Sequence, residues 1–599
     1  MKKLGRLGVI GSGPSTVYVL KHLIDSVDIL GGGLESLTIY ERDELMGYGM
    51  PFNPQTTDRY NLSNIASEEI PELPESLFEW LSGQDAELLE GWGIRQAELT
   101  ASEVYPRLAL GGYFHEQYRK LVSAFSEAGI QVTERPCCEV SDIKDFPDEG
   151  RVRVFTENGE DDYDTLIVAT GHSWGNEDRT DEGYYASPWP IFKILPGEGS
   201  YYNFTVGMLG ASLSAFDVVS SLAHRHGEFL PDGDGFRYQL HEGAEGFRLA
   251  MHSSEGWLPH LQWDQVEPMR EIYRHTTREQ LFGLLNEKGF LRLETYFNQV
   301  CRPALIKAFA LDGMGRMVDL LNREDFDFDD FVEEMSVRHD YVDSFEGMRK
   351  EMAEAKDSVE NHRPIHWKEV LDDLMYCLNY HAEILPAGDH LFLRKTVMPF
   401  LMNVIAAMPL QSGQILLALN DAGILDLVEG RVTVDKKASS GAGCTMVKVE
   451  NGNKTSEIAY RMYVDCSGQK PMELHDYPFL GLAQAGTVRS ARAPFLSAER
   501  AARSHQSNPD LIFYEKGIPY LKTGGIDIDS AYRVVGADGC ANPRIYDISF
   551  PHTSGVRPYS YGLQACSATA GILVEAWAKD GGDTGEGELK QVSKLYGKI

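Results

Sequence analysis

A glycine-rich turn near the start of the chain constrains the fold more than any other feature of the sequence. Gly11-Ser12-Gly13-Pro14-Ser15-Thr16 follows a short apolar run and opens a segment with helical periodicity, and Glu41 ends the next apolar run. Gly11 permits a tight turn, and Gly13 lets backbone N–H groups approach a pyrophosphate at the helix N-terminus. Glu41 can accept hydrogen bonds from an adenosine ribose. The pattern predicts a Rossmann-like dinucleotide-binding fold, in which Thr16 takes the place of the usual third glycine.

The rest of the chain predicts an α/β protein with a helical insertion. A buried strand is expected at 165–169, and a second strand–turn–helix begins at 204–209. Helical periodicity with many charges replaces the strand signals from about 267 to 393, and short strands then return. We expect the first part of the nucleotide-binding domain in 1–198, a second nucleotide-binding-like unit in 199–265, the helical insertion in 266–395, a return to the α/β core in 396–470, and the C-terminal part of the first domain in 471–599.

The composition argues against nucleic-acid and membrane surfaces. The net charge is −34, from 90 acidic and 56 basic side chains, whereas both surfaces attract clustered Lys and Arg. No apolar run approaches the ~20 residues of a membrane helix. The 8 cysteines contain no C-x-x-C pair, so we expect reduced thiols, no metal site and a cytoplasmic protein. We interpret the acidic run Glu324–Glu334, which also holds three phenylalanines, as a solvent-exposed face of a helix or turn.

Short motifs occur in a characteristic order over most of the chain outside the helical segment. They are Glu41-Arg42, Gly47-Tyr48-Gly49, Asn61-Leu62-Ser63, Phe78-Glu79-Trp80-Leu81, Tyr105-Pro106-Arg107, Gly112-Tyr113, Ala169-Thr170-Gly171-His172-Ser173, Ser187-Pro188-Trp189-Pro190, Val464-Asp465-Cys466-Ser467-Gly468 and Gly524-Gly525-Ile526. This set resembles a bacterial family of FAD/NAD(P)-binding oxidoreductases, distantly similar to N-hydroxylating flavin monooxygenases. The resemblance implies FAD as the cofactor. Activities within the family are diverse or undefined.

The resemblance also implies which residues contact FAD. Arg42 can stack on adenine or reach its ribose. Arg107 can neutralise the pyrophosphate or a substrate carboxylate, or it can form a surface ion pair. Gly171 lets the backbone pass close beneath the cofactor. The expected FAD contacts before the second turn are Gly11, Gly13, Pro14, Ser15, Thr16, Glu41, Arg42, Asn61, Arg107, Thr170 and Gly171.

Three further contact residues, Asp547, Gly562 and Leu563, are expected near the C-terminus. Related flavoproteins end a strand here at an Asp that holds the ribityl chain, but strand register places Phe550 at that point. Asp547 lies three residues earlier and either substitutes for that Asp or leaves the contact absent. Gly562 and Leu563 open the last helix, whose N-terminus can stabilise a reduced anionic flavin.

The second turn resembles a nicotinamide-dinucleotide site with altered chemistry. Gly210-Ala211-Ser212 places a serine at the second glycine, where a side chain crowds a pyrophosphate. Ser254 and Glu255 stand where the family usually carries Ser-Arg, and they offer no positive charge for a 2′-phosphate. Three interpretations follow: NADH in place of NADPH, a nicotinamide site used only transiently, or a unit kept for packing.

The main functional hypothesis is a single-component flavin monooxygenase. It would form a C4a-(hydro)peroxyflavin with electrons from NADH or NADPH and oxygenate a small polar substrate, possibly at an amino group, with molecular oxygen. His172 is the candidate catalytic residue, either as a proton donor near the flavin or as a structural histidine. Two alternatives stay open: a flavin oxidase or dehydrogenase reduced by its own substrate, and an FAD-binding interaction protein without turnover. The sequence does not indicate the oligomeric state.

Overall fold

The first domain is a Rossmann-like unit built from both ends of the chain. The computed structural model describes residues 3–172, 177–337, 344–469 and 471–579, so Ser173 of the strand-end motif lies outside the described residues. A six-stranded sheet has the order β23-β24-β9-β1-β2-β5, with all neighbours parallel except the pair β23–β24. The strands are β1 (Gly5–Ile10), β2 (Leu34–Tyr40), β5 (Gln131–Arg135), β9 (Thr165–Val168), β23 (Arg533–Val535) and β24 (Ala541–Asp547).

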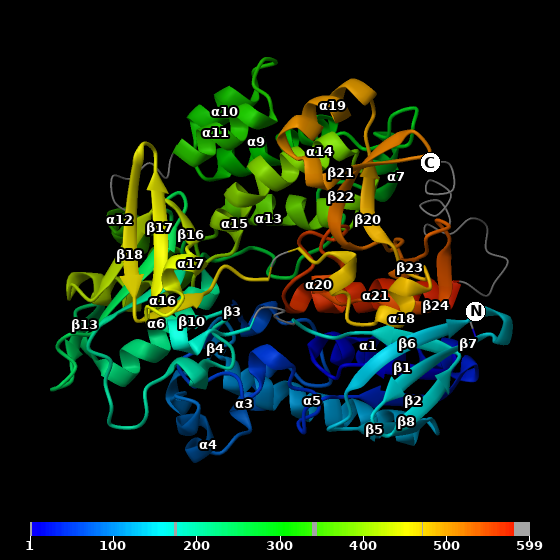
Figure 1. The fold of residues 1–599 in the computed structure, drawn as a ribbon, viewed down its shortest axis with the longest axis horizontal. Coiled ribbons are helices and arrows are strands. Elements are labelled where there is room, and N and C mark those ends of the chain that lie inside the picture. Colours follow the sequence, from blue (N-terminus) through cyan, green and yellow to red (C-terminus); the bar gives the residue numbers. More distant parts are fainter. Residues whose placement is uncertain (1–2, 173–176, 338–343, 470, 580–599) are drawn as a thin grey trace.

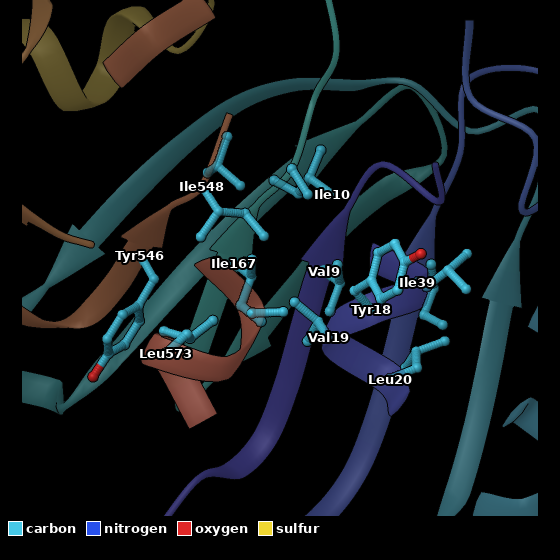
Figure 2. Close-up of a cluster of buried hydrophobic side chains, with 14 of the residues drawn as sticks. Val9, Ile10, Tyr18, Val19, Leu20, Ile39, Ile167, Tyr546, Ile548 and Leu573 are labelled. Atoms are coloured by element: carbon cyan, nitrogen blue, oxygen red, sulfur yellow. The ribbon is translucent and has the colours of Figure 1, made fainter. Parts of the chain in front are cut away.

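Helices cover this sheet and close its core. Val9 and Ile167 on the strands pack with Val19 of α1 (Pro14–Asp25) and Leu573 of α21 (Leu563–Lys579), all of them buried (Figure 2). Helix α5 (Arg107–Glu127) contacts α1 as well. The N-terminal turn and the last helix are therefore neighbours in space although they lie more than 500 residues apart. The predicted α/β class and the Rossmann-like first domain are confirmed.

A second α/β unit forms the left side of the molecule (Figure 1). Its parallel sheet has the order β10-β19-β11-β14-β15. Its members are β10 (Tyr184–Tyr185), β11 (Thr205–Leu209), β14 (Arg248–Ser253), β15 (Leu425–Glu429) and β19 (Met462–Asp465), with α6 (Leu213–His226) and α16 (Leu410–Asp421) in the same core. The chain that returns after the helices thus supplies two strands to this second sheet.

The helical segment lies above both sheets (Figure 1). It contains α7 (Arg278–Gly283), α8 (Leu293–Tyr296), α9 (Arg302–Leu311), α10 (Gly315–Leu321), α11 (Phe328–Val337), α13 (His366–Asn379), α14 (Ala387–Phe392) and α15 (Met398–Ile405). Helix α12 (Ser344–Glu360) belongs to the same stretch of sequence but lies beside the second unit and packs against α16 in the core of that unit. The core of the helical segment also takes in Tyr559 and Ala565 from the C-terminal segment. The helices are therefore packed onto the part of the first domain that leads into α21.

Smaller antiparallel sheets complete the fold. They are β3 (Leu62–Ala66) with β4 (Val104–Pro106), β6 (Val140–Phe146) with β7 (Arg151–Thr156) and β8 (Gly159–Tyr163), β12 (Gly227–Asp232) with β13 (Gly235–Leu240), β16 (Arg431–Val434) with β17 (Thr445–Asn451) and β18 (Lys454–Tyr460), and β20 (Ser490–Pro494) with β21 (Ile512–Glu515) and β22 (Ile518–Ile526). Within the described ranges, no helix has the length and apolar character needed to cross a bilayer.

Candidate cofactor and substrate site

One large cavity runs between the first domain, the second unit and the helical segment. Its volume is about 830 Å³, within the usual range of ligand sites. It begins at Gly11 on the first turn and extends past Thr170 at the end of β9 to Gly562 at the start of α21. Arg270 and Asp372 line its end beneath the helices. The cavity therefore joins the predicted cofactor turn to a polar region that the sequence did not reveal.

The first turn has the backbone geometry that a pyrophosphate site requires. Gly11 has a φ of +99°, and a Cβ there would lie 2.4 Å from the carbonyl oxygen of Ala169. A Cβ on Gly13 would lie 3.1 Å from the Cα of Gly49. Helix α1 begins at Pro14, and no side chain caps its N-terminus. Pro14 has no N–H, and Thr16 N and Val17 N donate to Gly13 O at 2.9 and 3.1 Å. The N–H of Ser15 therefore stays available for an anionic ligand, and the lack of side chains at Gly11 and Gly13 leaves room for its approach.

Ser12, a residue that sequence reasoning did not single out, fixes the side chain of Glu41 at the tip of β2. Glu41 Oε2 accepts hydrogen bonds from Ser12 Oγ at 2.7 Å and Ser12 N at 3.1 Å, and Glu41 Oε1 accepts from Asp43 N at 3.1 Å. Ser12 Oγ also accepts from Gly47 N at 3.1 Å. Glu41, Arg42, Pro14 and Ser15 all line the cavity. The turn and this carboxylate fit the pyrophosphate and adenosine ribose of FAD.

Two expected contacts face away from the cavity lining. Thr16 Oγ1 donates to Gly11 O at 2.7 Å, so the residue at the third glycine position stabilises the turn itself. Asn61 is buried, and its Nδ2 donates to Ser221 Oγ at 2.9 Å and to Asp217 O at 3.2 Å. Asn61 thereby joins the first domain to α6. The structure does not bring either residue to the cavity surface.

Arg107 lines the cavity but already has a buried partner. Its Nη2 lies 2.7 Å from Asp217 Oδ2, and the two side chains are 14% and 6% exposed, so this is no surface ion pair. Its Nε donates to Leu62 O at 3.0 Å, and its guanidinium lies 5.5 Å from the ring centroid of Trp189. Burial raises the pKa of Asp217 to about 7, although Arg107 lowers it. Arg107 therefore connects the two α/β units at the cavity wall.

Thr170, Gly171 and His172, at the end of β9, line the cavity. His172 Nδ1 lies 3.1 Å from Gln469 Oε1. Burial lowers the pKa of His172, so its imidazole is neutral at pH 7. A neutral imidazole therefore forms part of the cavity wall.

Of the two alternatives for Asp547, the structure agrees with the absent contact, because a histidine lies between Asp547 and the cavity. The side chain of Asp547 is fully buried, and Oδ2 accepts from Tyr477 OH at 3.0 Å and lies 2.8 Å from His552 Nδ1. It does not belong to the cavity lining, whereas His552 and Phe550 do. The cavity-facing polar group of this segment is thus His552, oriented from behind by Asp547. Gly562 and Leu563 line the cavity at the N-terminus of α21, where they were expected.

The second turn lies beside the cavity but not on its surface. Gly210 has a φ of +109°, Ser212 is the exposed N-cap of α6, and Leu213 is the first residue of this helix to line the cavity. Arg248 lies at the opposite end of β14, paired with Thr205, and its Nη1 donates to backbone carbonyls nearby. Arg248 is therefore remote from the turn.

Sequence reasoning missed a polar cluster at the far end of the cavity. Arg270 Nε donates to Asp372 Oδ2 at 2.6 Å, and Tyr559 OH donates to Asp372 Oδ1 at 2.9 Å. Glu69 and Gln265 line the same cavity. These side chains come from a 3-10 helix, a loop, α13 and the C-terminal segment, so no spacing in the sequence could connect them.

Comparisons with known proteins agree with this site. Residues 8–173 match the family model described as FAD-NAD(P)-binding, and residues 279–405 match the YdhS-like middle domain. The uncharacterized protein YdhS of Escherichia coli (strain K12) is 26% identical over 482 residues, which cover 80% of this chain and 86% of that protein.

Two solved structures resemble the chain along nearly its whole length. An ornithine N-hydroxylase of Kutzneria sp. 744 has a TM-score of 0.45 at 13% identity, over 95% of this chain and 98% of that one. An L-lysine 6-monooxygenase of Pseudomonas syringae has a TM-score of 0.44 at 12% identity, over 96% and 99%. These scores are too low to carry an activity over. The domain match confirms FAD and NAD(P)H as cofactors, and the chain is distantly related to FAD/NAD(P)-binding oxidoreductases.

Proposed function

We propose that the protein is a single-component, FAD-dependent monooxygenase that oxygenates a small polar substrate with electrons from NADH or NADPH. The observation that carries the proposal is the single cavity that joins the glycine turn to the polar cluster beneath the helical segment. A dinucleotide held at the turn leaves that cluster as a separate place for a second molecule.

The residues at the turn would hold the cofactor. Gly11, Gly13 and the N-terminus of α1 bind the pyrophosphate, and Glu41 binds the adenosine ribose. Bound FAD supplies electron transfer from a nicotinamide nucleotide to oxygen. Leu563 and its neighbours at the N-terminus of α21 place N–H donors on the cavity wall, where they favour negative charge on a ligand.

The far end of the cavity would bind the substrate and exclude water. Trp263, Tyr559 and Tyr561 line it with aromatic surface, and the helical segment covers it. The neutral imidazole of His172 is placed to accept or return a proton at the cavity wall. Substrate binding would use the polar cluster, and exclusion of water would depend on the helical segment that covers the cavity.

Anaerobic titration of the purified protein with NADH and with NADPH, followed by admission of oxygen, tests the proposal. We expect either nucleotide to reduce the flavin and oxygen to reoxidise it. Reduction by a substrate alone, with no reduction by either nucleotide, would contradict the monooxygenase and favour a substrate-reduced oxidase. An absence of redox turnover of any kind would favour an interaction protein.

A further inference from the structure

The polar cluster at the far end of the cavity carries unbalanced negative charge. Arg270 is bonded to Asp372 through Nε, and Tyr559 donates to the other carboxylate oxygen of Asp372. Arg270 also donates its backbone N–H to Gln564 Oε1 at 2.7 Å. One cation and one anion are thus matched within the cluster, and its remaining charged side chain is Glu69.

Glu69 is fixed at the cavity wall near Arg270, but Arg270 is already bonded to Asp372. Glu69 lies in the 3-10 helix Ser67–Glu69, and its Oε1 accepts from Ala66 N at 3.1 Å. Its side chain also bonds to that of Gln265. Over the ranges that the structure describes, no Lys, Arg or His forms an ion pair with Glu69. A carboxylate that is removed from bulk water and left unpaired favours a cationic ligand.

Aromatic side chains at this end of the cavity give a second, independent indication of the kind of ligand. The side chain of Trp263 lines the same cavity and is 7% exposed, and Lys368 Nζ lies 5.2 Å from the centroid of its ring. Tyr559 and Tyr561 add aromatic surface to this end of the cavity. Aromatic faces attract cations, and two of these rings already contact one: Lys368 lies over Trp263 and Arg270 lies over Tyr559.

We propose that the cavity end beneath the helical segment is a binding subsite for a small organic cation, with Glu69 as the residue that selects its charge. The inference rests on the proposed function, because the cation is the substrate of that site. It goes further in that it assigns the substrate's charge and the residue that recognises it.

Binding at this subsite depends on pH. Burial raises the pKa of Glu69 to about 7, and the negative charge of Asp372 acts in the same direction. The hydrogen bond from Ala66 N–H, the charge of Arg270 and the hydrogen bond with Gln265 lower the pKa in part. Glu69 is therefore mostly protonated at pH 6 and mostly ionised at pH 8. Only the ionised form attracts a cation, so the affinity rises with pH, roughly tenfold between these two values.

Calorimetric titration of the purified protein with three probes of matched size tests the proposal. The probes are n-butylammonium, n-butanol and butyrate, and neither nucleotide nor substrate is added. At pH 8 we expect the cation to bind more tightly than the alcohol and the anion, and about tenfold more tightly than it does at pH 6. Glu69→Gln keeps an oxygen for Ala66 N–H and should remove the pH dependence. The matched control is Glu68→Gln, which changes an exposed neighbour on the same 3-10 helix and should preserve it.

Two results would overturn the inference: a cation that binds no more tightly than butanol at pH 8, or a folded Glu69→Gln protein with the pH dependence intact. The first result decides the matter even if the variant does not fold. Because no redox step is measured, a failure of cation binding leaves reduction by NADH or NADPH untouched. If the protein fails to oxygenate a substrate, calorimetry still measures whether the cation binds.

Discussion

Replacing Glu41 by glutamine isolates the contact expected to distinguish an adenosine ribose at the first turn. In the structure both carboxylate oxygens of Glu41 face donors: Ser12 Oγ–H and N–H on one side, and Asp43 N–H on the other. An amide has one oxygen and one NH₂ group, so Glu41→Gln must set two donors against each other on one side. The side chain then turns or loses a bond, and its negative charge is lost in either case.

We expect Glu41→Gln to weaken the binding of FAD. Losing one hydrogen bond between a charged group and the ribose costs about 1.5–3 kcal/mol, which corresponds to a dissociation constant for FAD roughly 10- to 150-fold weaker. Titration of the flavin-free protein with FAD, followed by flavin fluorescence, measures it directly.

The matched control is Glu44→Gln, which removes the same charge from an exposed side chain outside the cavity lining. It should bind FAD like the unaltered protein. A Glu41→Gln protein whose affinity for FAD stays within about twofold of the unaltered protein would refute the role of this carboxylate.

Three further predictions concern the second unit and its junction with the first. Arg107→Lys keeps the charge beside Asp217 but loses the hydrogen bond from Nε to Leu62 O. Denaturation in urea should therefore show a free energy of unfolding lower by about 1.5–3 kcal/mol, with FAD content unchanged. Loss of FAD at unaltered stability would show instead that Arg107 holds the cofactor. NADH and NADPH should reduce the flavin at similar rates in stopped flow, because Ser254 and Glu255 are exposed and offer no cation while Arg248 lies at the other end of β14; a strong preference for NADPH would contradict this. Ser212→Trp should abolish reduction by either nucleotide and leave FAD bound, since the bulky side chain blocks the N-terminus of α6; normal NADH-driven turnover in the folded variant would refute a nicotinamide site at this turn.

Local sequence patterns predicted the parts of the site whose residues lie close together in the chain. The turn from Gly11 to Thr16 is specified by a strand, two glycines and a helix start, and all three are local features. The acidic run Glu324–Glu334 was predicted as an exposed face, and its acids are largely exposed. However, Phe326, Phe328 and Phe331 point into the helical core, which a charge pattern alone does not reveal.

Long-range packing determined the features that the sequence could not show. Asp547 was expected either to replace the ribityl-binding Asp or to leave that contact absent, and the sequence did not decide between the two. The chain turns into a short helix after β24 and brings His552 to the cavity, while Asp547 stays behind it. The cluster of Glu69, Arg270 and Asp372 exists only because the helical segment packs over the first domain. Such sites depend on how separate segments meet in space, and a single sequence carries no spacing signal for that.

The cofactor content of the purified protein tests the central claim most directly. The protein should be yellow, and denaturation should release FAD in an amount equal to that of the chain, because we propose that Gly11, Gly13 and Glu41 bind a pyrophosphate and an adenosine ribose. FMN lacks both the second phosphate and the adenosine. Release of FMN, or a colourless protein that binds no FAD on titration, would contradict the account.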